Sequence, residues 1–125
     1  KALRVVCKTS WLAHSAPLFH RLCTLNVSDI NKLQTGCFMY MAVNNLLPAP
    51  FADYFTLNAN VHHYSTRQSK NIHHSSTRTS LRKFSIKNCG SSLWNSLPSV
   101  LKNKPSVHFF KVAYKCFLIS AYTTV

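Results

Sequence analysis

The chain has 125 residues, of which 46% are hydrophobic and 12% aromatic, which is enough to build the core of one small domain. It carries 15 Lys and Arg but only two acidic residues, Asp29 and Asp53, for a formal charge of +13. Such a shortage of carboxylates argues against an active site complete within the chain. A surface this positive is most simply explained by a polyanionic partner, either nucleic acid or an anionic membrane.

Residues 1–57 are predicted to be a helical region. The short amphipathic piece at residues 1–8 is compatible with a helix end or a strand. Ser15 then offers an N-cap for a second helix, and Ser28 offers one for a third, with Asp29 at the favourable end of its dipole. Apolar residues at intervals of three or four follow, at Ile30, Leu33, Cys37, Phe38 and Met41. Pro48 and Pro50 should end this third helix, and residues 51–55 fit one further turn.

Residues 58–89 form a basic segment rich in His, Ser and Arg, which is expected to be an irregular loop followed by a short strand. The strand is predicted at residues 81–87 (LRKFSIK), where alternate residues differ in character. Gly90 is expected to turn the chain at the end of this segment.

Residues 90–125 are predicted to be C-terminal helices. Ser91 or Ser92 should cap a short helix in which Trp94 is a core anchor, and Pro98 should end it. Pro105 and Ser106 then open a last helix, whose apolar face is predicted to comprise Phe110, Ala113, Tyr114, Phe117 and Ala121. The fold class is therefore mainly α, with a basic irregular or extended middle segment and one short strand pair, in one partial domain.

Metal, cofactor and catalytic sites receive no support from the sequence. Five Cys residues, no two of them closer than 14 positions, form no disulfide framework or zinc knuckle, so we expect reduced, mostly buried thiols in a cytoplasmic or nuclear, reducing compartment. The His pairs at 62–63 and 73–74 lack the spacing of zinc ligands. No phosphate-binding glycine loop or nucleophile elbow is present, and no apolar run suits a membrane span. We therefore expect no catalytic residue, no metal, no cofactor and no membrane partner.

The positive signal lies between His62 and Lys87. The predicted nucleic-acid-binding residues are Tyr64, Arg67, Lys70, Arg78, Arg82, Lys83 and Lys87. The cations would neutralise phosphates, the hydroxyls around them would add hydrogen bonds, and Tyr64 would stack on unpaired bases. Six phosphate contacts predict a log-affinity slope of about −5 against log salt on a duplex. The alternatives are a solvated loop whose charges maintain solubility, and a membrane-surface contact.

Four phrases in order carry a resemblance to a known family. They are HSAPLFHRLCTLNVSDINKLQTGCFMYMAVNNLLP (14–48), HHYSTRQS (62–69), FSIKNCGSSLWNSLP (84–98) and SVHFFKVAYKCFL (106–118). Together they resemble the extreme C-terminal region, beyond the palm, of jockey-like non-LTR retrotransposon reverse transcriptases.

The resemblance implies a parent RNA-directed DNA polymerase whose catalytic Tyr-x-Asp-Asp motif lies upstream. This chain contains no such motif, so it would be a non-catalytic appendage that holds template, primer or target. Two alternatives remain open. The chain could be an interaction module that docks on the upstream polymerase domain through Phe110 and Phe117, or the product of a decayed element with no selected function.

Overall fold

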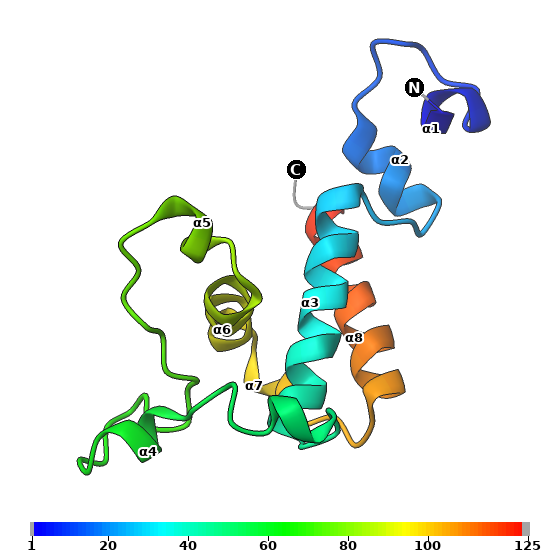
Figure 1. Cartoon of the computed structure of the whole chain (residues 1–125). Helices are drawn as coiled ribbons and strands as arrows, with labels where there is room; N and C mark the ends of the chain where they lie inside the picture. Colours follow the sequence, from blue (N-terminus) through cyan, green and yellow to red (C-terminus); the bar gives the residue numbers. More distant parts are fainter. Residues whose placement is uncertain (1, 124–125) are drawn as a thin grey trace.

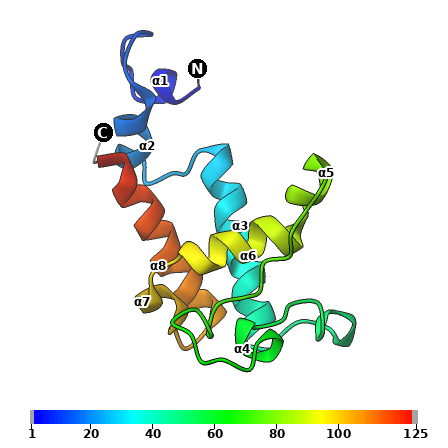
Figure 2. The same ribbon diagram turned by 90° about the vertical axis from the view of Figure 1, so that its left-hand side faces the viewer.

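Three helices form the centre of the molecule. A computed structural model describes residues 2–123 and is mainly helical, which confirms the predicted fold class (Figure 1). Helix α3 (Val27–Val43) lies antiparallel beside α8 (Val107–Ser120), and α6 (Ile86–Ser96) crosses α3 steeply (Figure 2). The shorter elements are α1 (Ala2–Val6), α2 (Ser15–Arg21), η1 (Ala49–Phe51), α4 (Asn58–Val61), α5 (Ser80–Lys83), α7 (Ser99–Lys102) and η2 (Ala121–Thr123). Residues 1, 124 and 125, which the predicted boundaries include, lie outside the described range.

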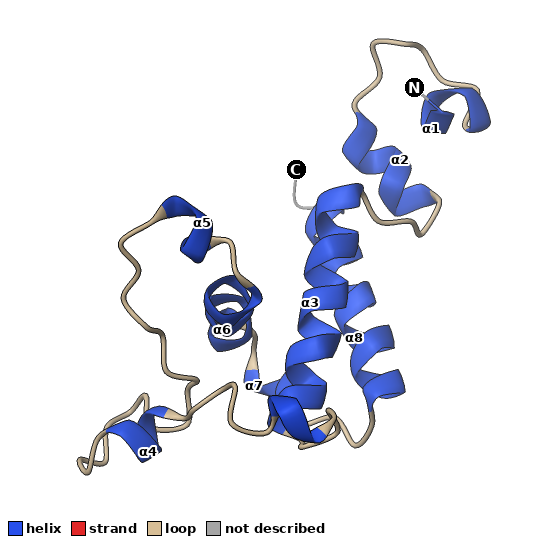
Figure 3. Ribbon diagram, viewed as in Figure 1, coloured by secondary structure: helices blue, strands red, loops and turns tan. Residues whose placement is uncertain are grey.

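Strand pairing is minimal. Within residues 2–123 the one β contact is an isolated antiparallel bridge between Leu57 and Ile72, and Figure 3 shows helices joined by loops. None of the described helices is long and apolar enough to cross a bilayer. The strand predicted at residues 81–87 is wrong, because α5 and the start of α6 occupy this stretch, and the chain is more helical in its middle than its sequence pattern indicated.

Helix α3 begins one residue before the predicted cap. The side chain of Asn26, not Ser28, accepts a hydrogen bond from the backbone N–H of Asp29 at 2.8 Å. Asn and Ser cap helices about equally well, so the sequence did not decide between them. The helix ends at Val43, and Asn45 then takes a left-handed backbone (φ 55°), a conformation that Asn tolerates better than most residues.

The core lies where α3, α6 and α8 meet. Phe110 and Met39 are completely buried, and Trp94 is 4% exposed, as predicted for a core anchor. The ring of Tyr40 stacks on Phe110 at 4.9 Å, and its hydroxyl donates to the backbone carbonyl of Lys104. The polar end of this core tyrosine is thereby satisfied without reaching solvent.

The two glycines of the chain lie at helix crossings. A Cβ on Gly36 would stand 2.6 Å from Cε1 of Tyr114 on α8, and one on Gly90 would stand 2.7 Å from Sδ of Met39 on α3. Both glycines therefore allow close approach of two helices. The predicted turn at Gly90 is wrong, because Gly90 lies in the middle of α6.

Helix α6 starts six or seven residues earlier than predicted. Ser85 occupies its N-cap position, and Ser91, a predicted cap, is buried inside the helix with its hydroxyl donating to the carbonyl of Lys87 at 2.6 Å. Residues 80–83 form α5 rather than a strand. The alternation at 81–87 misled because Leu81 and Phe84 are 87% and 81% exposed, so the apolar residues of this stretch do not face a core.

Helix α8 begins as predicted. Ser106 is its N-cap and accepts a hydrogen bond from the backbone N–H of Phe109. Its phenylalanines differ in burial, however: Phe110 is completely buried, whereas Phe109 and Phe117 are 60% and 46% exposed.

The N-terminal helices attach at the far end of α3 (Figure 1). Residues 2–6 are helical, which resolves the alternative left open for the first eight residues, and α2 has His14 rather than Ser15 at its N-cap position. The ring of Phe19 on α2 packs 5.8 Å from that of Tyr122, whose hydroxyl donates to the buried carboxylate of Asp29. This contact joins α2, the start of α3 and the end of the described chain.

Candidate nucleic-acid interface

The seven predicted binding residues are all exposed, but they do not form one patch. Tyr64, Arg67 and Lys70 lie on the loop that contains α4, which we call the basic loop (residues 56–73). Arg78, Arg82 and Lys83 lie on or beside α5 and Lys87 lies at the start of α6, on what we call the basic arm (residues 74–87). Figures 1 and 2 both show α4 and α5 well apart, at different ends of the same side of the molecule.

The basic loop is closed at its base by backbone hydrogen bonds. The N–H of Asn58 donates to the carbonyl of Asn71 at 2.9 Å, and the N–H of His73 donates to that of Thr56 at 2.7 Å. These bonds flank the Leu57–Ile72 bridge. The segment predicted to be irregular is therefore a pinned loop with both ends held together.

Asn95 of α6 attaches the base of this loop to the core. Its side-chain oxygen accepts from the N–H of Ile72 at 3.0 Å, and its amide nitrogen donates to the carbonyl of Ile72 at 2.9 Å. One side chain thus satisfies both backbone groups of a residue that is 2% exposed, in the manner of a neighbouring strand.

Asn88, seven residues earlier on α6, attaches the basic arm in a similar way. Its amide nitrogen donates to the carbonyl of Arg82 at 2.6 Å, and its oxygen accepts from the hydroxyl of Ser75 at 3.2 Å. Asn88 is 3% exposed, so these bonds lie away from water. Two asparagines on one helix therefore hold the two groups of cations in place.

The spacing of the two groups decides how they act. Residues seven apart on a helix are about 10 Å apart along its axis. That distance equals the Debye length of about 10 Å at 0.1 M salt, so charges placed beyond each anchor are largely screened from one another. We therefore treat the basic loop and the basic arm as two contact points.

Lys87 differs from the other predicted residues. It lies in the first turn of α6, and its ammonium stands 5.2 Å from the ring centroid of Tyr54. A cation–π contact of this kind holds the ammonium near the aromatic residues that follow α3.

Carboxylates do not neutralise these cations. Within residues 2–123 the one ion pair joins Lys32 to Asp29, at 2.8 Å, in the first part of α3 and outside both basic segments. The positive field around the basic loop and the basic arm is therefore available to an external anion.

A hollow of about 390 Å³ lies between the basic arm and α6. Its lining residues are His74, Thr77, Lys83, Phe84, Asn88, Cys89 and Ser92. Of these, only Lys83 was predicted as a site residue. Phe84, the second aromatic residue of the basic stretch beside Tyr64, was not among the predicted binding residues.

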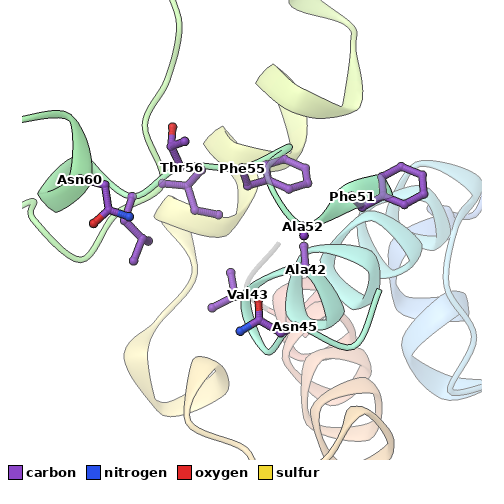
Figure 4. A pocket seen from close by; sticks show the side chains of 10 residues that line it. Ala42, Val43, Asn45, Phe51, Ala52, Phe55, Thr56 and Asn60 are labelled. Carbon is purple, nitrogen blue, oxygen red and sulfur yellow. The ribbon is translucent and has the colours of Figure 1, made fainter. Parts of the chain in front are cut away.

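A second hollow, of about 250 Å³, lies where the end of α3 meets residues 51–60 (Figure 4). Phe51, Phe55 and Val43 contribute apolar walls, and Asn45 and Asn60 contribute amides. Its lining contains no acid, base or thiol, so it offers no group for proton transfer or nucleophilic attack.

Cysteine and histidine form no metal centre in the part of the chain that the structure describes. All five thiols are free, but only Cys37 is buried, whereas Cys23, Cys89 and Cys116 are exposed; the prediction of mostly buried thiols is wrong. Burial raises the pKa of the Cys37 thiol, and the charge of Lys111 offsets part of that effect.

Comparisons with protein-family models, curated protein sequences and solved structures find no match to this chain. Function must therefore be argued from its own residues.

Proposed function

We propose that the chain binds nucleic acid without catalysing a reaction, as the C-terminal segment of an RNA-directed DNA polymerase of a non-LTR retrotransposon. The ordered phrases quoted above support the parentage. The observation that carries the binding function is the pair of cation groups, unneutralised by carboxylates and each attached to α6 by an asparagine side chain.

Binding would be nonspecific, because exposed Arg and Lys side chains contact phosphates and carry no sequence information. Anchoring of the loop and arm lowers the entropy that must be lost on binding. A single strand or duplex that contacts both groups would lie along the length of α6.

Removal of two charges at a time tests this proposal. We expect Arg67→Ala/Lys70→Ala and Arg82→Ala/Lys83→Ala each to reduce the slope of log affinity against log salt by about 2 on duplex DNA. Fluorescence anisotropy of a labelled duplex, titrated at several salt concentrations, measures the slope.

Lys111→Ala/Lys115→Ala is the matched control, because it removes two exposed charges from α8, away from both basic segments. It should change the slope little. Equal losses in all three double variants would mean that net charge, rather than these two segments, governs binding.

A second candidate function is docking on the upstream polymerase domain, and the outer face of α8 favours it. Phe109 and Val112 are 60% and 50% exposed there, next to the exposed Cys116. Phe110 cannot serve as the test residue, because it is completely buried and its replacement by Ser would unfold the core. Under this alternative, Phe109→Ser abolishes co-purification with the polymerase domain and leaves polyanion binding intact.

A further inference from the structure

The hollow between the basic arm and α6 combines three features that one ligand class would use together. Its volume, about 390 Å³, falls within the range of about 300–1,000 Å³ that is usual for ligand pockets. Its walls come from residues 74–77, from the end of α5 and from α6. It opens beside the cations of the arm, so an anionic ligand is favoured at its mouth.

Phe84 supplies an aromatic wall that the fold leaves uncovered. It is 81% exposed although it sits next to α6, and no other described ring contacts it. Among the exposed apolar side chains of the arm, Phe84 is the one that lines the hollow, where a ligand can reach its ring. Flat aromatic faces flanked by Arg and Lys are how proteins hold unpaired bases.

Polar groups at the rim have hydrogen-bonding capacity to spare. Within residues 2–123, no hydrogen bond engages the side chains of His74, Thr77 or Ser92. An imidazole and two hydroxyls together offer donors and acceptors to the edge of a base.

The hollow is also held in shape before any ligand arrives. Asn88 forms part of its lining, and through its bonds to Arg82 and Ser75 it fixes both walls of the arm against α6. The thiol of Cys89, which also lines the hollow, lies 3.5 Å from the carbonyl of Phe84. A site preorganised in this way loses little entropy on binding.

We propose that this hollow takes one unpaired nucleobase, stacked on Phe84, while Lys83, Arg82 and Arg78 hold the neighbouring phosphates. This inference rests on the proposed function and deepens it: the arm would prefer single-stranded over duplex nucleic acid. A concave site with polar groups at its rim suits a base better than it suits a lipid surface. Binding to lipid vesicles is therefore measured as well, to test for a membrane contact instead.

The test compares two labelled single strands of equal length and charge, oligothymidylate and the same backbone carrying stable abasic residues. For the full chain we expect the base-bearing strand to bind about tenfold more tightly, because a stacked base is worth that much or more. Phe84→Ala should bring the affinity for the base-bearing strand down to the abasic level and leave the abasic affinity unchanged. Leu81→Ala, at an equally exposed residue of the arm that does not line the hollow, should preserve the preference.

The outcomes distinguish failure of the base site from failure of the proposed nucleic-acid binding. Salt-dependent binding with equal affinity for both strands, or a preference that survives Phe84→Ala, overturns the base site and leaves the proposed function standing. Absence of binding to either strand at low salt overturns the proposed function as well. Equal affinity for the two strands together with a loss of binding to phosphatidylserine vesicles on Phe84→Ala would make this surface a membrane contact and overturn the base site.

Discussion

Gly36 and Gly90 each pack against a side chain of another helix, and these two side chains differ in flexibility. Gly36 faces the ring of Tyr114, which is 1% exposed and held between α3 and α8. Gly90 faces the thioether of Met39, which has rotatable bonds and adapts to a new neighbour more easily. The same substitution should therefore have different costs at the two sites.

We expect Gly36→Ala to lower the free energy of unfolding by about 1–3 kcal/mol, because overpacking against a fixed ring outweighs the gain of about 1 kcal/mol in helix propensity. Gly90→Ala, as the matched variant, should be within about 1 kcal/mol of the wild type. Equilibrium urea unfolding measures both. A stabilised Gly36→Ala variant would contradict the close approach of α3 and α8.

Asp29 is the one buried acid among the described residues, and its partners set its charge. Burial raises the pKa of its carboxyl, but the hydrogen bonds from Lys32 and Tyr122 outweigh burial, so the pKa lies below its ordinary value. Burial and the hydrogen bond to Asp29 raise the pKa of Tyr122. The ionised acid next to a neutral tyrosine is thus the favoured pairing in the folded chain.

This pairing predicts a stability window. A lowered pKa means that the contribution of Asp29 is complete above the unfolded value of about 3.9 and is lost as the pH falls through the folded value. A raised pKa means that the contribution of Tyr122 is complete below about pH 10 and is lost as the pH rises. Tyr122→Phe should destabilise the fold by about 1 kcal/mol at pH 7, and by less at about pH 2. A pH-independent difference in urea unfolding would contradict this account.

At the scale of elements, α6 connects the core to the basic segments. Its core face carries Gly90 and Trp94, and its outer face carries the buried Asn88 and the half-buried Asn95, each bonded to the backbone that it anchors. Loss of Asn95 would leave the N–H and the carbonyl of the buried Ile72 without partners, which costs about 1–3 kcal/mol.

Asn95→Ala should therefore release the base of the basic loop while the three-helix core stays folded. We expect faster hydrogen exchange at Ile72 and at Asn71, measured by NMR, and a loss in unfolding free energy of about 1–3 kcal/mol. Ser96→Ala, at the exposed neighbouring position, is the control and should leave these amides protected. Unchanged exchange at Ile72 in Asn95→Ala would show that other contacts hold the loop.

The elements that the sequence predicted best are those with long apolar periodicity. Helices α3 and α8 were identified with small errors at their ends, because their stripes extend over several turns. Helix α6 was shortened and α5 was taken for a strand, because seven residues of alternating character are too few to separate the two periods. The roles of Asn88 and Asn95 could not be predicted, since they depend on which loop residues the tertiary fold places opposite them.

At the scale of the whole molecule, the charge that dominates the composition is divided between two anchored segments. The sequence correctly located the exposed cations but could not show that Tyr64, Arg67 and Lys70 lie apart from those beside α5. It also missed the hollow at Phe84, because its lining residues, all between His74 and Ser92, come together only when the basic arm packs on α6. A run of charged residues can be recognised in a sequence, whereas a surface that forms only when separate segments pack together cannot.

The salt dependence of binding tests the central claim most directly. That claim is that cations without carboxylate partners bind a phosphate backbone. An anisotropy titration of the full chain against labelled RNA, over a series of salt concentrations, gives the slope of log affinity against log salt. Six phosphate contacts predict a slope of about −4 on a single strand and about −5 on a duplex. A flat dependence, or no binding at low salt, would contradict the account.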